Sequence, residues 1–231
     1  MVLGMDQLLG IDLKVVGPDQ LPRWNQESPL HHTALYNTQV DFDSRSPFPF
    51  NFELNNKVIL WKGDITTLQA DVIVNSTNEH LTEKNQGSEH LFLKAGPGLK
   101  KQIEENGFEC KTGEVCVTHG HLLPSKYIIH TVGPLYNVRY KSAAENTLHT
   151  CYRNVLQQAV ELKARSIGLC VINSVKRNYP PDEGAHIALR TIRRFLENQT
   201  SSSCQGLETV VLVVDSCDCG IYEVLMPLYF P

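Results

Sequence analysis

The sequence predicts an α/β fold in which helices cover both faces of a central sheet. Short apolar runs, such as residues 71–74 (DVIV) and 209–214 (TVVLVV), are typical of strands that are buried on both faces. Longer segments between these runs place apolar side chains three and four residues apart, which is the spacing of an amphipathic helix. Strands that alternate with such helices are typical of a sheet covered on both sides.

The first 56 residues show little periodicity and many proline and glycine interruptions, including Ser46-Pro47-Phe48-Pro49. This composition predicts an extended, partly disordered lead-in at residues 1–56. Its aromatic side chains are candidates for docking on the main body: Trp24, Phe48, Phe50 and Phe52. Residues 57–231 are expected to form one domain.

From residue 57 onward, the pattern of apolar residues defines an alternation of strands and helices. Strands are predicted at residues 58–61, 71–74, 113–118, 127–130, 166–172 and 209–214. Helices are predicted at residues 89–105, 143–162, 183–197 and 222–226. Gly96-Pro97 divides the first of these helices in two, because proline removes a backbone donor and clashes with the preceding turn.

The composition is that of an ordinary soluble protein, with 42% apolar and 20% charged residues in a chain of 231. A formal charge of −4 gives no general attraction to nucleic acid or to an anionic membrane, so any binding of a polyanion would need a local patch. No run approaches the roughly 20 apolar residues that span a bilayer, so no transmembrane segment is expected.

The N-terminus and the cysteines indicate a cytoplasmic or nuclear protein. Asp6 and Asp12 interrupt the first apolar stretch, which makes it a poor signal peptide. The seven scattered cysteines are an odd number and suit reduced thiols better than a disulfide framework. Cys217 and Cys219 alone are a weak metal motif, and we expect neither a metal site nor a cofactor.

Ligands of open α/β sheets bind beyond the carboxyl ends of the strands. Four loops are therefore candidates for a binding site, at residues 62–65, 75–87, 130–134 and 173–180.

These loops and their neighbours carry a resemblance to a known family. The segments "GDIT", "DVIVNSTN", "AGPGL", "TGEVCVTHGHLLPSKYIIHTVGP", "CYRNVLQQA" and "ALRTIRRFL" resemble the macro domain, an ADP-ribose-binding module, in order and in spacing. The resemblance covers roughly residues 57–230. It implies a three-layer α/β/α sandwich with a mixed central sheet.

The resemblance also implies ligand contacts. Asp64 falls where the family's aspartate binds the adenine amino group, Ile65 where a backbone N–H meets the ring, and Asn78 where an asparagine faces the distal ribose. From the residues alone, Asp64 could equally be a turn residue and Asn78 a loop-capping side chain. The further candidate ligand-binding residues are Asn75, Ser174, Val175, Lys176, Arg177 and Tyr179.

Both phosphate loops of the family are altered in this chain. Glu83, Lys84, Asn85 and Gln86 stand where the family has four glycines, and Val175 and Asn178 replace two more. Backbone N–H groups approach phosphate closely only where no Cβ intervenes, so this mode of binding is expected to weaken. Lys176 and Arg177, with Lys84, are candidates to hold phosphate by charge instead. The alternative is that the side chains of Lys176 and Arg177 point into solvent and that the cleft is closed.

The position of the aspartate that hydrolytic relatives use falls on Ser88, and no catalytic residue is assigned. A serine cannot act as a general base near neutral pH. Glu89 is adjacent, but one residue turns a helical side chain about 100° away.

The leading interpretation is a non-catalytic module that binds ADP-ribose-like ligands, poly(ADP-ribose) or RNA, or that retains no ligand. The alternative is a macro-type hydrolase, which removes ADP-ribose from modified proteins or deacetylates O-acetyl-ADP-ribose with Asn75 or Asn78 and an acid such as Glu83 or Glu89. A third interpretation is a structural domain of a longer protein.

Two further groups of residues are interpreted from their residue types and positions. The basic helix face formed by Arg190, Arg193 and Arg194 is either solvated or a contact for nucleic acid. His119, His121 and His130 are interpreted as structural histidines, because no carboxylate or cysteine stands at ligand spacing.

Overall fold

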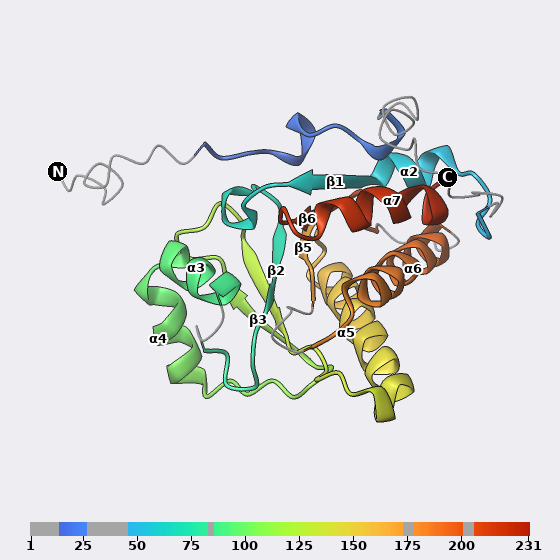
Figure 1. Ribbon diagram of the computed structural model, residues 1–231. Coiled ribbons are helices and arrows are strands. Elements are labelled where there is room, and N and C mark those ends of the chain that lie inside the picture. The colour runs from blue at the N-terminus through green and yellow to red at the C-terminus, as the bar shows by residue number, and fades with distance from the viewer. Residues whose placement is uncertain (1–13, 27–45, 83–85, 173–177, 201–205) are drawn as a thin grey trace.

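A six-stranded sheet lies between two layers of helices in the computed structural model (Figure 1). The structure describes residues 14–26, 46–82, 86–172, 178–200 and 206–231 of the chain. The three-layer α/β/α arrangement confirms the fold class that the sequence predicts.

The sheet is mixed, with the spatial order β1-β6-β5-β2-β4-β3. Its strands are β1 (Val58–Lys62), β2 (Val72–Ser76), β3 (Val115–His119), β4 (Tyr127–Thr131), β5 (Ser166–Cys170) and β6 (Thr209–Val214). All neighbours pair in parallel except β3, which is antiparallel to β4 at one edge. Val210 and Leu212 of β6 pack into one core and Val211 and Val213 into the other. Alternate residues of a strand face opposite sides, so a strand covered on both sides is apolar throughout.

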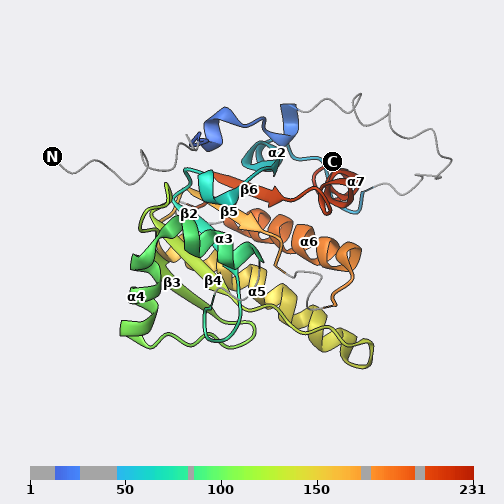
Figure 2. The ribbon, with the colours of Figure 1, turned by 60° about the vertical axis from the view of Figure 1, so that its left-hand side comes forward.

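Helices cover both faces of the sheet, as Figure 2 shows. They are α2 (Phe52–Lys57), α3 (Gln86–Ala95), α4 (Pro97–Asn106), α5 (Lys141–Glu161), α6 (Pro181–Thr200) and α7 (Cys219–Tyr229). Helices α3 and α4 pack on one face, and α5, α6 and α7 on the other. None of the helices in the described part of the chain is both long and apolar enough to cross a membrane.

The predicted strands and helices are present, with boundaries shifted by a few residues. Strand β3 begins at Val115 rather than at residue 113, because Gly113 has a φ of +90° and forms a turn before the strand. Helix α2 was not predicted, since it lies in the stretch expected to be extended. The side chain of Asn51 accepts a hydrogen bond from Leu54 N and caps this helix.

Parts of the lead-in dock on the main body. Trp24 and Phe48 are buried in the larger core, and Trp24 Nε1 donates a 2.8 Å hydrogen bond to the carbonyl oxygen of Phe230. Phe50 and Phe52 are exposed, so only two of the four aromatic candidates dock. The indole and the phenyl ring join the lead-in to the C-terminal end of the chain.

Arg193 holds three segments together from inside the protein. Its side chain is 1% exposed, and its guanidinium donates to Tyr229 O at 3.0 Å, to Pro49 O at 2.8 Å and to Glu197 Oε1 at 2.8 Å. The guanidinium also lies 5.3 Å from the centre of the Phe48 ring. The interpretation of Arg193 as part of a solvated or nucleic-acid-binding face is therefore wrong, because the side chain points into the core.

Replacing Arg193 with methionine is expected to lower the free energy of unfolding by about 3 kcal/mol, because the buried Tyr229 carbonyl and the partly buried acceptors on Pro49 and Glu197 lose their donor. Urea unfolding at neutral pH measures the effect. Arg194→Met is the matched control: its side chain is 68% exposed and pairs with Glu197 only at 4.0 Å, so the loss should stay below about 1 kcal/mol. Equal losses in the two variants would contradict the structural role of Arg193.

Candidate functional site

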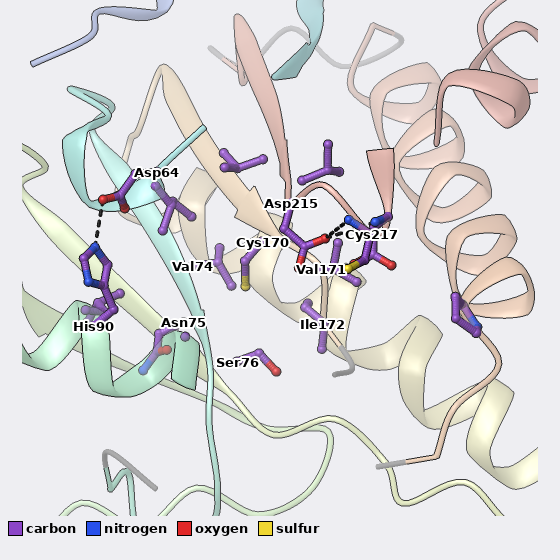
Figure 3. Close-up of a pocket in the computed structure, with 18 of the residues that line it drawn as sticks. Asp64, Val74, Asn75, Ser76, His90, Cys170, Val171, Ile172, Asp215 and Cys217 are labelled. Atoms are coloured by element: carbon purple, nitrogen blue, oxygen red, sulfur yellow. Dashed lines mark hydrogen bonds and ion pairs between the residues drawn. The ribbon is translucent and has the colours of Figure 1, made fainter. Parts of the chain in front are cut away.

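A cavity of about 600 Å³ opens at the carboxyl ends of β1, β2, β5 and β6 (Figure 3). Its described lining combines the turn at residues 63–66, the strand ends and the first turns of α3 and α6. The residues that matter for its chemistry are Asp64, Ile65, Asn75, His90, Tyr179 and Asp215. The volume is in the range of small-molecule sites, which is about 300–1,000 Å³.

Asp64 stands at one end of the cavity with both carboxylate oxygens engaged. Oδ1 accepts hydrogen bonds from Thr66 N at 2.9 Å and Thr66 Oγ1 at 2.7 Å. Oδ2 lies 2.8 Å from His90 Nε2 on helix α3. Burial on its own would raise the pKa of Asp64, but the hydrogen bonds from His90 and Thr66 outweigh it and lower the pKa below its ordinary value. Asp64 is therefore a carboxylate at neutral pH.

Two neighbouring segments fix the turn that carries Asp64. A Cβ on Gly168 of β5 would lie 2.6 Å from Leu68 Cδ2, so the missing side chain at this position makes room for Leu68 in the segment after Asp64. On its other side, Val16 of the lead-in exchanges backbone hydrogen bonds with Thr67 and Gln69 at 3.0 and 2.9 Å. The lead-in thus supports one end of the cavity.

Asn75 belongs to a buried polar network below the cavity. Its Nδ2 lies 3.1 Å from Nδ1 of His130, and Nε2 of His130 lies 2.9 Å from Thr118 Oγ1. Because the amide nitrogen of Asn75 can only donate, Nδ1 accepts and Nε2 carries the hydrogen. Burial lowers the pKa of the fully buried His130 to about 3, so its ring is neutral. The interpretation of His130 as a structural histidine is confirmed.

Ser88 is part of the same network and does not face the cavity. It is 1% exposed, and its Oγ accepts a 3.1 Å hydrogen bond from Asn75 Nδ2. Glu89 is exposed on the surface of α3. Neither residue is among the described residues that line the cavity. Among the described residues, therefore, neither Ser88 nor Glu89 presents a side chain to the cavity.

Asn78 caps its own loop. Its Oδ1 accepts from the backbone N–H of His80 at 3.1 Å and of Thr82 at 3.2 Å, and its Nδ2 donates to Thr82 Oγ1 at 2.6 Å. Asn78 is not among the described lining residues. The structure thus shows the loop-capping role that its residue type suggests, and a ribose contact stays a prediction.

Tyr179 lines the cavity beside the second altered loop. The side chain is 4% exposed, and its hydroxyl has no hydrogen-bond partner within the described part of the chain. Its neighbour Asn178 has a φ of +55°, a left-handed conformation that glycine favours and asparagine tolerates. Ser174, Val175, Lys176 and Arg177 lie outside the described residues, as do Glu83, Lys84 and Asn85, so their predicted contacts stay predictions.

The sequence analysis did not identify two further carboxylates of the cavity lining, Asp215 and Asp218. Asp215 follows β6, and its Oδ1 accepts from the backbone N–H of Cys217 at 2.8 Å and of Asp218 at 3.0 Å. Burial, together with the charge of Asp215, raises the pKa of Asp218. Because β6 was recognised as a strand, the rule that ligands bind beyond carboxyl ends could have found Asp215. Nothing in the sequence pattern marked His90.

A model of the macro domain family matches residues 74–188. Human ganglioside-induced differentiation-associated protein 2 is 46% identical over 227 residues, and a homologue of it from Nematostella vectensis is 44% identical over 223 residues. Each alignment covers 96% of this chain but only 44% of the relative, so the chain spans less than half the length of these relatives.

Solved structures of macro domains are also similar to this chain. The crystal structure of the macro domain of ganglioside-induced differentiation-associated protein 2 is 47% identical, with a TM-score of 0.82 over 94% of this chain and 98% of that one. The Oceanobacillus iheyensis macrodomain with ADP is 37% identical (TM-score 0.65, 72% of this chain and 88% of that one). The Trypanosoma brucei macrodomain in complex with ADP-ribose is 26% identical (TM-score 0.72, 97% and 87%).

Because His130 is neutral in the folded protein, we expect the free energy of unfolding to fall on acidification. The unfolded chain takes up a proton below the ordinary histidine pKa of about 6.5, whereas the folded protein does so only near pH 3. The stability that His130 contributes is therefore complete above pH 6.5 and is lost on acidification, by about 1.4 kcal/mol per pH unit.

Urea unfolding between pH 4.5 and 7 tests this difference. His130→Gln should be less stable at neutral pH and should lose this part of the pH dependence. The exposed His119→Gln is the control and is expected to keep the wild-type slope. The same slope in His130→Gln and in the wild type would rule out a neutral buried His130.

Proposed function

Because the chain belongs to the macro domain family, we propose that it is a non-catalytic module that binds an ADP-ribose unit, either free or at the end of a longer polymer. The observation that carries the proposal is the position of Asp64. Its ionised carboxylate and the following residue, Ile65, stand at the edge of a nucleotide-sized cavity. The family resemblance assigns adenine recognition to these two residues.

The comparisons support the same ligand class. The Trypanosoma brucei macrodomain was solved with ADP-ribose and the Oceanobacillus iheyensis macrodomain with ADP. Both share the fold with this chain over most of their length.

The charges of the cavity favour a single nucleotide unit over RNA. The described lining contains three carboxylates, Asp64, Asp215 and Asp218, and neither lysine nor arginine. Grooves that follow single-stranded nucleic acid are positively charged along their length. Lys176 and Arg177, which lie outside the described residues, are the proposed phosphate contacts. RNA binding with a steep salt dependence would favour the charge-driven alternative.

Asp64→Ala is expected to weaken ADP-ribose binding by about tenfold to a hundredfold, because the amino group of the base loses a charged acceptor. Isothermal titration calorimetry measures the affinity, and circular dichroism checks the fold. Glu105→Ala removes an exposed carboxylate on α4 and should leave the affinity unchanged. An unchanged affinity in Asp64→Ala would show that ADP-ribose, if bound, occupies another place.

The absence of catalysis is proposed from the surroundings of Ser88. A general base needs a titratable group within hydrogen-bond reach of the reacting water. Ser88 is neutral and bonded to Asn75 inside the protein. Glu89 is exposed and is not among the described residues of the cavity wall. A hydrolase mechanism would therefore need an acidic residue other than Glu89.

Release of ADP-ribose from modified aspartate or glutamate is expected to stay near background, since loss of a catalytic base typically costs about 10²–10⁴-fold in rate. A time course with an ADP-ribosylated peptide measures the release, and an active hydrolytic macro domain serves as the positive control. Robust turnover that survives in Ser88→Ala but disappears in Glu89→Gln would contradict the proposal. It would show that the neighbouring carboxylate had taken over the role.

A further inference from the structure

The hydrogen bond between His90 and Asp64 joins two elements across the edge of the cavity. His90 lies on α3, and Asp64 follows β1; Figure 3 shows the imidazole turned toward the carboxylate. Their side chains are 45% and 37% exposed, so a ligand in the cavity can reach both.

The two carboxylate oxygens of Asp64 differ in what they can still accept. Each carboxylate oxygen has about two acceptor positions. Thr66 fills both positions of Oδ1 with its backbone N–H and its hydroxyl. His90 fills one position of Oδ2, which leaves one acceptor position for a ligand.

The direction of the His90 hydrogen bond follows from the charge of Asp64. Hydrogen bonds from His90 and Thr66 outweigh burial and lower the pKa of Asp64, so the carboxylate is ionised and can only accept. The Nε2 atom of His90 must therefore carry the hydrogen. The imidazole donates a charge-assisted bond and does not use up the remaining position of Oδ2.

Thr66 restrains the carboxylate of Asp64 only through Oδ1. The bond from His90 adds a restraint at Oδ2, which narrows the rotation of the carboxylate about its Cβ–Cγ bond and so defines the direction of the open acceptor position. Fixing a group in its binding orientation before the ligand arrives removes part of the entropic cost of binding.

We propose that His90 is a positioning residue, which orients Asp64 Oδ2 toward the amino group of a bound adenine base. The inference rests on the proposed binding of an adenine nucleotide in this cavity. His90 should therefore raise the affinity only for ligands that donate a hydrogen bond to Asp64.

The test compares two ligands and four proteins by calorimetry. The ligands are ADP and purine riboside 5′-diphosphate, which carries hydrogen in place of the 6-amino group. The proteins are the wild type, His90→Ala, His90→Gln and His119→Ala. Glutamine keeps an N–H donor at a similar reach, and His119 is an exposed histidine on β3.

His90→Ala should weaken ADP binding by about threefold to tenfold and leave the affinity for the 6-hydrogen analogue unchanged. His90→Gln should restore most of the loss, and His119→Ala should have no effect. A merely structural role of His90 would weaken both ligands equally.

Three further results would overturn the inference. Tighter ADP binding in His90→Ala would mean that the imidazole competes with the ligand for Asp64. An unchanged ADP affinity in His90→Ala, with binding still lost in Asp64→Ala, would remove the role of His90 while the proposed function stands. Absence of ADP and ADP-ribose binding in the wild type would overturn both.

Discussion

The neutral, fully buried imidazole of His130 is the constraint that ties the sheet to the cavity. It lies on β4 and contacts Thr118 of β3 on one side and Asn75 of β2 on the other, and Asn75 in turn reaches Ser88 at the start of α3. A buried polar group without a partner costs about 1–3 kcal/mol, so each residue of this hydrogen-bond network holds the next in place. The ends of three strands and the first turn of α3 are fixed by one set of contacts.

Hydrogen bonds to otherwise unpaired polar groups also anchor the lead-in and the C-terminal end of the described chain. Carbonyl groups near the C-terminus accept from Arg193, from Trp24 and from Asn55, which donates to Pro231 O at 2.7 Å. The lead-in is therefore part of the folded body where it is described, and its backbone contacts at Val16 support the turn that carries Asp64. Sequence far from the cavity thus contributes to the geometry of the binding site.

The sequence predicted features that depend on local periodicity or on a shared motif. The apolar runs marked every strand, and the position of Asp64 after β1 marked one end of the cavity. Local sequence patterns could not show which side of α6 Arg193 occupies, because the acceptors of this side chain lie near the C-terminus and in the lead-in. They also did not mark His90, because its proposed role in orienting Asp64 depends on a partner 26 residues earlier in the chain.

A crystal structure of the protein with ADP-ribose tests most directly whether this cavity is the binding site. We expect the adenine amino group within hydrogen-bonding distance of Asp64 Oδ2, with the bond from His90 to the same oxygen retained. Ser88 should remain bonded to Asn75 below the cavity, away from the ligand. A ligand bound outside the cavity, or an adenine base directed away from Asp64, would contradict the account.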